Sequence, residues 1–522
     1  MLGKRDPQNG LFTAASRIPV DLEDFGIYGR LALEGRQLFR DAQFASAYSK
    51  KGRTSVPPSL LALACLLQHH EGISDAEVVE RTMYDLRWKV ALDLDPVQVV
   101  APFAKSTFQG FRVRLTLHEK EAVAFERSVQ VAREAGLFPK KLQVALDSSP
   151  VRGRGAIKDT FNLLSDAIRC AVRAIARKRG HEASEEAAKI GVERHFSEAS
   201  IKGQVAIDWD DPKAKNAFLA SLLADCRLVF KAAQRAKYTG DELGLLKKVI
   251  AQDVDESGDQ PEIRDGVAKD RTISAQDPDM RHGRKSSGKV FNGHKAHLAV
   301  ETTTEIITAV DMTAPATADG SKVAELVGET ERLTGAEVAT ALGDSAYSSH
   351  TAVEQAVQAE VDLVAKLPEP PKGKIGPRAF TVSEDRLKAK CPAGHESSKQ
   401  YRSKETVRHV WDPVICGACP LRSSCLAKKD SDRRSVSVGP DFHGRVQRAK
   451  RAKSSNGRAL LRRRVVVEHA FARVKNLGAG TARYFGRAKT KTQWLWSVAL
   501  VNLKRIWTLV DAAAVEAAAA VA

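Results

Sequence analysis

The sequence has no run of about 18 uncharged apolar residues, the length that a membrane-spanning helix needs. Cysteine is also scarce: the 522 residues include seven, and four of these stand between positions 391 and 425. This distribution argues against a disulfide framework and favours a reducing compartment with one local metal site. The first residues, MLGKRDPQNG, lack the apolar segment of a secretory signal. We therefore expect a cytoplasmic protein that is not inserted in a membrane.

Basic charge is what the chain has in excess. Lys and Arg number 82 against 64 Asp and Glu, which gives a net charge of +18. Because 43% of the residues are hydrophobic, the chain can fill ordinary cores, and its length predicts roughly two to four structural units. A globular protein this basic usually has a polyanionic partner, most often nucleic acid. A ribosome-associated protein or one that binds an anionic membrane surface is the alternative.

The texture of the sequence changes along the chain. Helical patterns dominate the first part, where Ser74 and Glu77 form a capping-box pattern, and this part suits either a DNA-binding head or a plain packing domain. Further on, strand and helix patterns mix, which predicts an α/β fold. The predicted units are a helical N-terminal domain at 1–135, an α/β domain at 136–510 with a helical insert at about 155–255 and a cysteine-rich segment at about 380–430, and an Ala-rich tail at 511–522.

Two short apolar stretches each run into an aspartate. The first is KLQVALD, which ends at Asp147, and the second is EVATALGD, which ends at Asp344. Ligands collect beyond strand ends in open sheets, so the two side chains could meet despite their separation in sequence. Paired carboxylates repel each other unless one is protonated or a cation lies between them, and Mg²⁺ or Mn²⁺ would suit this role. The alternative is that each Asp only caps a turn.

A third acid stands alone in a basic segment, RRRVVVEHAFARVK, residues 462–475. Glu468 is the one carboxylate in the interval 442–510. With helical spacing, Arg464, Glu468 and Lys475 share one face, so the acid can complete a metal site while the cations hold phosphates. The alternative, a simple Arg464–Glu468 pair worth about 0.2–0.5 kcal/mol, does not explain why other acids are missing.

Taken in order, ALDSSP, ALGDSAY and RRRVVVEHAFARVK resemble the DDE transposases of bacterial insertion sequences. The resemblance runs from roughly residue 50 to residue 508 and includes the helical segment GISDAEVVERTMYDLRWKVAL. Several of those families carry a Tyr-x2-Arg-x3-Glu-x6-Lys signature. Arg464, Glu468 and Lys475 stand at the matching positions, whereas Leu461 stands at the tyrosine position.

The resemblance implies a ribonuclease-H-like core preceded by an all-helical DNA-binding domain. It also implies that Asp147, Asp344 and Glu468 hold two Mg²⁺ or Mn²⁺ ions for cleavage at the ends of an element and joining of each 3′-OH to target DNA. Asp311 and Asp319 are rivals for the second aspartate. The implied partner is double-stranded DNA at the nucleoid, bound by a homodimer when two ends are paired. A DNA-binding protein descended from a transposase, without catalysis, and a metal-dependent nuclease are the alternatives.

The clustered cysteines form a separate candidate site. Cys391, Cys416, Cys419 and Cys425 could bind one structural Zn²⁺, and His395 could replace one thiol. An iron–sulfur cluster and unliganded thiols are the alternatives. Because related transposases carry similar cysteine-bearing segments, the resemblance favours the metal, whose role would be folding of this segment and not catalysis.

Overall fold

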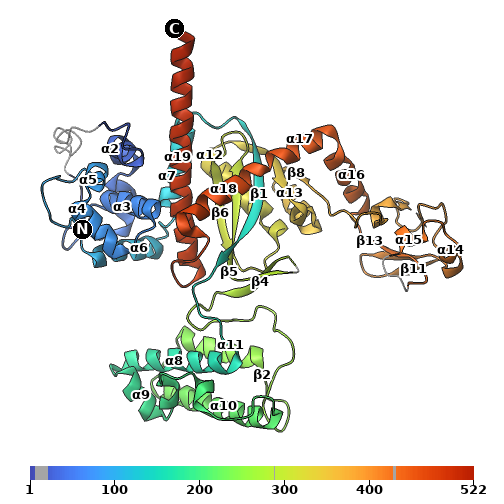
Figure 1. Cartoon of the computed structure of the whole chain (residues 1–522), viewed down its shortest axis with the longest axis horizontal. Helices are drawn as coiled ribbons and strands as arrows, with labels where there is room; N and C mark the ends of the chain where they lie inside the picture. The colour runs from blue at the N-terminus through green and yellow to red at the C-terminus, as the bar shows by residue number, and fades with distance from the viewer. Residues whose placement is uncertain (6–20, 287, 427–430, 522) are drawn as a thin grey trace.

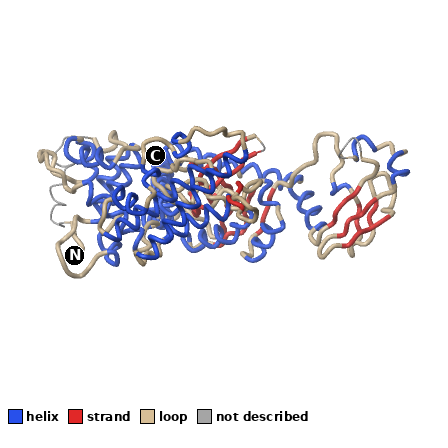
Figure 2. The backbone as a smooth tube through the Cα atoms, turned by 90° about the horizontal axis from the view of Figure 1, so that it is seen from below, coloured by secondary structure: helices blue, strands red, loops and turns tan. Residues whose placement is uncertain are grey.

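The computed structural model describes residues 1–5, 21–286, 288–426 and 431–521. A mixed sheet lies at the centre, with a helical body on one side, a small strand-rich lobe on the other and a helical insert beyond one end (Figure 1). Figure 2 shows the strand-rich lobe set apart at one end of an elongated molecule. The chain is therefore a mixed α/β protein that begins with helices, as the sequence predicts.

The described residues before the sheet fold into helices. These are α2 (Ile27–Leu38), the 3-10 helix η2 (Asp41–Ala47), α3 (Pro58–Glu71), α4 (Asp75–Tyr84), α5 (Leu86–Leu92), α6 (Lys105–Leu117) and α7 (Val123–Glu134). Helix α3 stops at Gly72, whose φ of 70° is the left-handed conformation that glycine adopts without strain. The predicted capping box of α4 is confirmed: the Ser74 hydroxyl accepts from the Glu77 N–H at 3.3 Å, and the Glu77 carboxylate accepts from the Ser74 N–H at 2.7 Å.

The last helix, α19 (Arg487–Val521), connects the helical body to the sheet. One of its faces is buried among the N-terminal helices, through Trp496, Leu500, Leu503 and Trp507. This confirms the apolar stripe of the sequence, which recurs at helical spacing, as core. Trp494, on another face, is buried against the sheet.

The central sheet has six strands. They are β1 (Lys141–Arg152), β4 (Arg281–Ser286), β5 (Lys289–Glu301), β6 (Ile307–Thr313), β7 (Glu337–Gly343) and β8 (Asp362–Ala365). The order is β4-β5-β1-β7-β8, with β6 also paired to β5; β5 is antiparallel to β1, while β7 and β8 run parallel to it.

Helices cover both faces of the sheet, and the alternation of side chains along β1 decides which residues meet which helix. Val144 and Leu146 of β1 lie in the core formed with α12 (Val323–Thr334) and α13 (His350–Gln358). Ala145 and Val151 point to the opposite face and lie in the core formed with α7, α19 and α18, the helix of Val465–Val474. Asp147 and Ser149 have the parity of this second face.

The prediction that the first strand ends at Asp147 is wrong. Strand β1 continues to Arg152, because β5 pairs with it along this whole stretch, as far as the match of Arg152 with Gly293. The parallel neighbour β7 matches β1 only as far as Ala145 and Leu342. Asp147 therefore lies within a strand, at the level where the neighbouring strand β7 has just ended.

The predicted helical insert is present between β1 and β4. Its helices are α8 (Thr160–Arg179), α9 (Ala183–Ile190), α10 (Pro212–Arg235) and α11 (Asp241–Asp253), and the short pieces are η3 (Glu193–Phe196), η4 (Ile201–Gln204), β2 (Val254–Asp255) and β3 (Glu262–Ile263). They enclose a hydrophobic core of their own. A buried polar chain also crosses the insert, since His195 contacts the Ser165 hydroxyl at 2.9 Å and the Asp225 carboxylate at 2.7 Å.

The strand-rich lobe follows β8 and carries the clustered cysteines. It contains η7 (Pro377–Ala379), β9 (Thr381–Val382), β10 (Ala389–Lys390), β11 (Lys399–Arg402), β12 (Val407–Val410), α14 (Pro413–Gly417), α15 (Arg422–Cys425) and β13 (Ser435–Val438). A small core around Trp411 holds it together. The basic helices α16 (Phe442–Lys453) and α17 (Ser455–Arg463) then return the chain to the sheet (Figure 1). Across the described ranges, none of the helices combines the length and the apolarity needed to cross a membrane.

Candidate active site

Asp147 lies on the face of β1 that α18 covers, with its side chain 21% exposed. One of its oxygens, Oδ1, accepts the N–H of Ser148 at 2.7 Å. Burial raises the pKa of Asp147 to about 6, and the neighbouring charge of Asp344 adds to this effect. A carboxylate with this environment gains from a cation, because the cation would compensate for lost solvation and for the repulsion between the two acids.

Asp344 follows the last residue of β7, where the sequence places it. It caps the 3-10 turn η6 (Ser345–Ser348), with Oδ1 accepting the Ala346 N–H at 2.8 Å. The residue before it must be small, since a Cβ on Gly343 would lie 2.4 Å from the Cβ of Tyr347. Tyr347 is fully buried, and burial together with the charges of the nearby acids raises its pKa well above the usual value. This packing fixes the carboxylate of Asp344 at the end of the strand.

Arg464 connects Glu468 to Asp147 through hydrogen bonds to both carboxylates. Arg464 stands at the joint between α17 and α18; its Nη1 lies 3.1 Å from Oδ2 of Asp147, and its Nη2 lies 2.6 Å from Oε1 of Glu468. The predicted Arg464–Glu468 pair is therefore present, and the same guanidinium also bonds to an acid 317 positions away. Buried side chains of α18 such as Val467 and Ala470 hold the helix on the sheet, so Glu468 stands at its exposed margin.

Lys475 reaches the same strand. Its ammonium group donates to the hydroxyl of Ser149, two residues beyond Asp147 and on the same face of β1. Burial and the charge of Lys285 lower the pKa of Lys475, while the negative charge of Asp147 acts in the opposite direction. Ser149 was not among the residues that the sequence singled out; its place two residues after an acid in a strand was the signal.

The two rival acids have different surroundings. Asp311, on β6, is bound by Lys322 at 2.8 Å and by Lys491 at 2.9 Å; although burial acts to raise its pKa, these bonds hold it far below the usual value. Asp319, in η5 (Asp319–Lys322), is paired with Lys295 at 3.0 Å. Its charge contributes to the raised pKa of Asp147, so Asp319 lies near the site, whereas Asp311 is already neutralised by two lysines.

The cysteines of the lobe gather around one hollow, which is lined by Cys391, Cys416, Cys419 and Cys425 and also by His395 and Trp411. All four thiols are free and partly buried. Burial raises the pKa of Cys425, and the other three thiols add to this effect. The Sγ of Cys391 accepts the backbone N–H of His395 at 3.4 Å. The four cysteines that the sequence singled out therefore line the same hollow, and their binding of a metal stays a prediction.

Neither the three acids nor the four cysteines are arranged as a finished metal site. In the part of the chain that the structure describes, no three His, Cys, Asp or Glu side chains are placed to hold one metal ion. At the acids, the guanidinium of Arg464 lies between the carboxylates of Asp147 and Glu468 and bonds to both. A cation already occupies the position between these two acids, so their charge and spacing suit a positively charged ligand.

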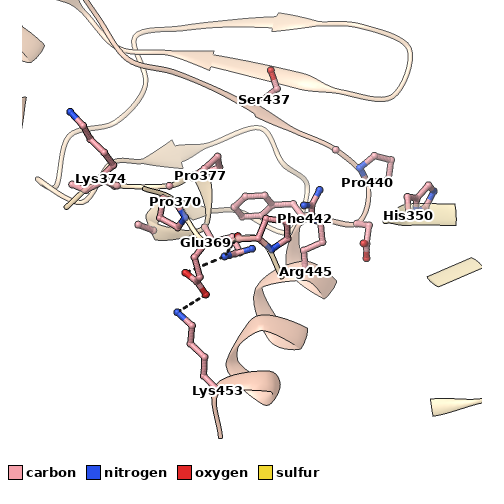
Figure 3. Close-up of a pocket in the computed structure, with 17 residues that line it drawn as sticks. His350, Glu369, Pro370, Lys374, Pro377, Ser437, Pro440, Phe442, Arg445 and Lys453 are labelled. Atoms are coloured by element: carbon pink, nitrogen blue, oxygen red, sulfur yellow. Dashed lines mark hydrogen bonds and ion pairs between the residues drawn. The ribbon is translucent and has the colours of Figure 1, made fainter. Parts of the chain in front are cut away.

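A larger hollow, of about 800 Å³, lies away from the acids, where the lobe meets α16. Figure 3 shows its wall formed by Phe442, Pro370 and Pro377, with basic side chains at the margin. Two acids line it, and both have basic partners: Lys453 lies 3.0 Å and Arg378 3.5 Å from the carboxylate of Glu369, and Arg448 pairs with Asp441. The hollow contains none of the predicted site residues.

The sheet thus brings acids together with an arginine and a lysine, in a mixed α/β fold. Comparison with known families gives the particular class. The family described as "Transposase DDE domain" matches residues 390–507, and the family described as "Transposase domain (DUF772)" matches residues 33–114. No curated protein matches the chain. The chain thus contains a transposase DDE domain and a second transposase domain, which indicate an enzyme of DNA transposition and confirm the resemblance seen in the sequence.

Some of the predicted site residues lie within the two matched segments, and others lie outside them. Arg464, Glu468 and Lys475 lie within the matched DDE segment, as do the four cysteines. Asp147 and Asp344 lie outside both segments. The role of the two aspartates therefore depends on the geometry of the site.

Proposed function

We propose that Asp147, Asp344 and Glu468 are the catalytic carboxylates of this transposase. One observation carries the proposal: a single guanidinium, that of Arg464, bonds both to Asp147 and to Glu468. Asp344 follows β7, whose register with β1 runs to Ala145 and Leu342 and so brings Asp344 level with Asp147; its charge also raises the pKa of Asp147. Three acids from three distant parts of the sequence therefore act on one another at the sheet.

The sheet supports a ribonuclease-H-like core. Strands β6, β5 and β1 form an antiparallel set, and β7 and β8 follow on the other side of β1, parallel to it. Asp147 on the central strand and Asp344 after its parallel neighbour are then at adjacent positions, which is the arrangement that paired carboxylates need. We place the domain boundaries where the sequence suggested them, at 1–135, 136–510 and 511–522, and residues 511–521 of the tail continue α19.

The three acids fit a divalent ion by their chemistry, since Mg²⁺ and Mn²⁺ prefer carboxylate oxygens. DDE transposases typically use divalent metals, and such ions would supply activation of a hydroxyl and stabilisation of the leaving oxygen. The side chains of the chain itself do the positioning. Lys475 lies close enough to Asp147 to hold a DNA phosphate beside the acids, and Arg464 can grip a phosphate with two parallel hydrogen bonds.

The proposed substrate is double-stranded DNA. In the first step a phosphodiester at each end of the element is hydrolysed, and in the second each freed 3′-OH is joined to target DNA. The helices before β1 would bind the element end, and the pairing of two ends calls for a homodimer on DNA. The net charge of +18 supports a long contact with phosphates and a location at the nucleoid.

The test is an assay of cleavage and joining with purified protein, Mg²⁺ or Mn²⁺, and DNA carrying the ends of its own element. Asp147→Asn, Asp344→Asn and Glu468→Gln should each reduce both steps by roughly a hundredfold or more, because each removes a metal ligand. Asp210→Asn, an exposed acid of the insert, is the matched control. An active Asp147→Asn variant would refute the assignment. Cleavage without joining would indicate a nuclease, and binding without either step would indicate a protein that has lost catalysis.

We further propose that the four cysteines bind a structural Zn²⁺. The four cysteines line one hollow, and the Cys391 sulfur accepts the backbone N–H of His395, which follows Gly394, a glycine with a φ of 91°. Thiolates are the ligands that such zinc sites use. Metal analysis of the purified protein should find about one zinc per chain, and the double variant Cys416→Ser with Cys419→Ser should lose it. Iron with sulfide, or no metal, would contradict the proposal.

A further inference from the structure

Arg464 lies between the carboxylates of Asp147 and Glu468, where a metal ion shared by these two acids would lie. Its two nitrogens bond to Oδ2 of Asp147 at 3.1 Å and to Oε1 of Glu468 at 2.6 Å, and its side chain is 22% exposed. An ion shared by these acids needs carboxylate oxygens at about 2.1 Å. The guanidinium and the ion therefore compete for the same acceptors and carry the same sign of charge.

DNA phosphates could replace the two carboxylates as the acceptors of Arg464. It stands at the joint of α17 and α18, where the interval 442–510 contains no acid besides Glu468. The neighbouring cations Arg462 and Arg463 are exposed, so this edge of the site attracts phosphate. A guanidinium matches a phosphate as well as it matches a carboxylate, with two parallel hydrogen bonds. A backbone phosphate carries one negative charge over two oxygens, as a carboxylate does, so DNA lying on this edge would offer Arg464 alternative acceptors in place of the two acids it would leave.

We infer that Arg464 couples the binding of DNA to the binding of the catalytic metal. Without DNA, its guanidinium neutralises Asp147 and Glu468 and weakens their affinity for a divalent ion. When a DNA phosphate takes the guanidinium, the carboxylate oxygens become available and the metal binds more tightly. Linkage requires the reverse as well, so the metal must strengthen the binding of DNA by the same factor. This inference rests on the proposed catalytic carboxylates.

The coupling has a consequence for the enzyme. A divalent ion held by three acids can activate water against any phosphodiester that comes near. An arginine that neutralises the acids until DNA lies on the α17–α18 edge favours the assembly of the reactive site in the DNA-bound state. Lys475 cannot take this role, because its ammonium group bonds to the hydroxyl of Ser149 and not to the acids.

The test measures Mn²⁺ affinity directly, from the signal of free Mn²⁺ in electron paramagnetic resonance, with the full chain and with a duplex carrying an element end. The wild-type protein should bind Mn²⁺ about tenfold more tightly on DNA than alone, within the usual range of coupling between sites. Arg464→Gln should bind Mn²⁺ about tenfold more tightly than wild type without DNA, and DNA should add little. Arg464→Met, which keeps the apolar stem, repeats the measurement in case the glutamine variant folds poorly.

Arg227→Gln is the matched control. It removes the same charge from α10 of the helical insert, where Arg227 bonds to Glu256 at 2.9 Å and not to the acids. It should retain both the weak Mn²⁺ affinity and the gain on DNA. If Arg464→Gln and Arg464→Met bind Mn²⁺ no more tightly than wild type, or if DNA still gives them the full gain, the inference is wrong.

Asp147→Asn distinguishes failure of the proposed carboxylate site from failure of the proposed coupling. Measured on DNA, it gives the Mn²⁺ that the phosphates bind by themselves. If Asp147→Asn binds as much Mn²⁺ as wild type, the proposed carboxylate site itself fails. If it loses the ion while the Arg464 variants behave like wild type, the site stands and only the coupling is refuted.

Discussion

Two polar clusters of this chain use similar residues and have opposite characters. In the helical insert, His195 contacts Ser165 on one side and Asp225 on the other, and Arg194 completes the chain with an ion pair to Asp225 at 2.5 Å. Ser165 and His195 are 1% and 0% exposed. A serine, a histidine and an aspartate in this order suggest a nucleophile and its base. Because no substrate could reach the serine, the cluster instead holds α8, η3 and α10 together.

The cluster at the sheet is built the other way. Its acids are partly exposed, Asp147 at 21% and Glu468 at 55%, and they share one counter-charge, Arg464. Burial leaves Asp147 with a raised pKa, whereas in the insert each polar group has a partner. Solvent exposure and incomplete pairing of charges are thus what set a candidate reactive site apart from a structural network. Residue types alone would have suggested that the serine, histidine and aspartate of the insert were the reactive group.

The largest effect on stability should come from the insert. Asp225→Ala would leave His195 and Arg194 without their shared acceptor, and removal of one partner from a buried charged network costs on the order of 3–5 kcal/mol. Hydrogen exchange should show this loss as faster exchange of amides in α8 and α10. Asp210→Ala, on the exposed surface, is the control and should change little. Unchanged protection in Asp225→Ala would mean that the network does not hold the insert.

The second prediction concerns how the stability of the protein depends on pH through the raised pKa of Asp147. The pKa of Asp147 is about 6 in the folded protein against a usual value of 3.8, so the folded state holds a proton that the unfolded state has lost between these values. Its stabilising contribution is present below about pH 4 and disappears as the pH rises through 6, a loss of about 1–3 kcal/mol.

Thermal unfolding in the presence of a chelator, at several pH values from 4 to 8, checks this difference. Asp147→Asn cannot ionise, so it should become more stable than wild type above pH 6 while it loses catalysis. A variant less stable than wild type at pH 8 would show that the charge of Asp147 is fully compensated by Arg464, and the contrast with the insert would disappear.

The third prediction tests the phosphate side of the sheet cluster. Lys475→Gln should weaken DNA binding by about tenfold and lower the slope of log affinity against log salt concentration by about one, as expected for one lost phosphate contact. Lys231→Gln, on the exposed surface of α10, is the control of equal charge. An unchanged slope in Lys475→Gln would mean that its bond to Ser149 is structural, which would make it resemble the insert.

The parts of the site set by local spacing could be predicted from the sequence. The Arg464–Glu468 pair follows from helical spacing, and the position of Asp344 follows from an apolar strand that stops at a glycine. The capping box at Ser74 is local in the same sense. In each case the interacting residues are neighbours in the chain, so their geometry is set by the backbone between them.

The remainder depended on partners that are distant in sequence. Strand β1 extends beyond Asp147 because β5, over a hundred residues later, pairs with it, and nothing local marks that extension. The bond of Lys475 to Ser149 and the closeness of Asp319 arise in the same way, from the packing of α18 and η5 on the sheet. A pattern of apolar residues shows that a strand exists, but its length is set by the neighbour that supplies its hydrogen bonds.

The smallest effect on stability should come from Glu468, the acid within the matched DDE segment that we propose as catalytic. Glu468→Ala removes one partner of an exposed ion pair, and such pairs contribute about 0–1 kcal/mol. Its unfolding midpoint in urea should therefore differ little from that of wild type, while cleavage and joining are lost. The comparison with Asp225→Ala is then complete, because one acid would carry stability without chemistry and the other chemistry without stability. If Glu468→Ala unfolded as easily as Asp225→Ala, the pair with Arg464 would be holding α18 on the sheet, and loss of activity in that variant would no longer identify a metal ligand.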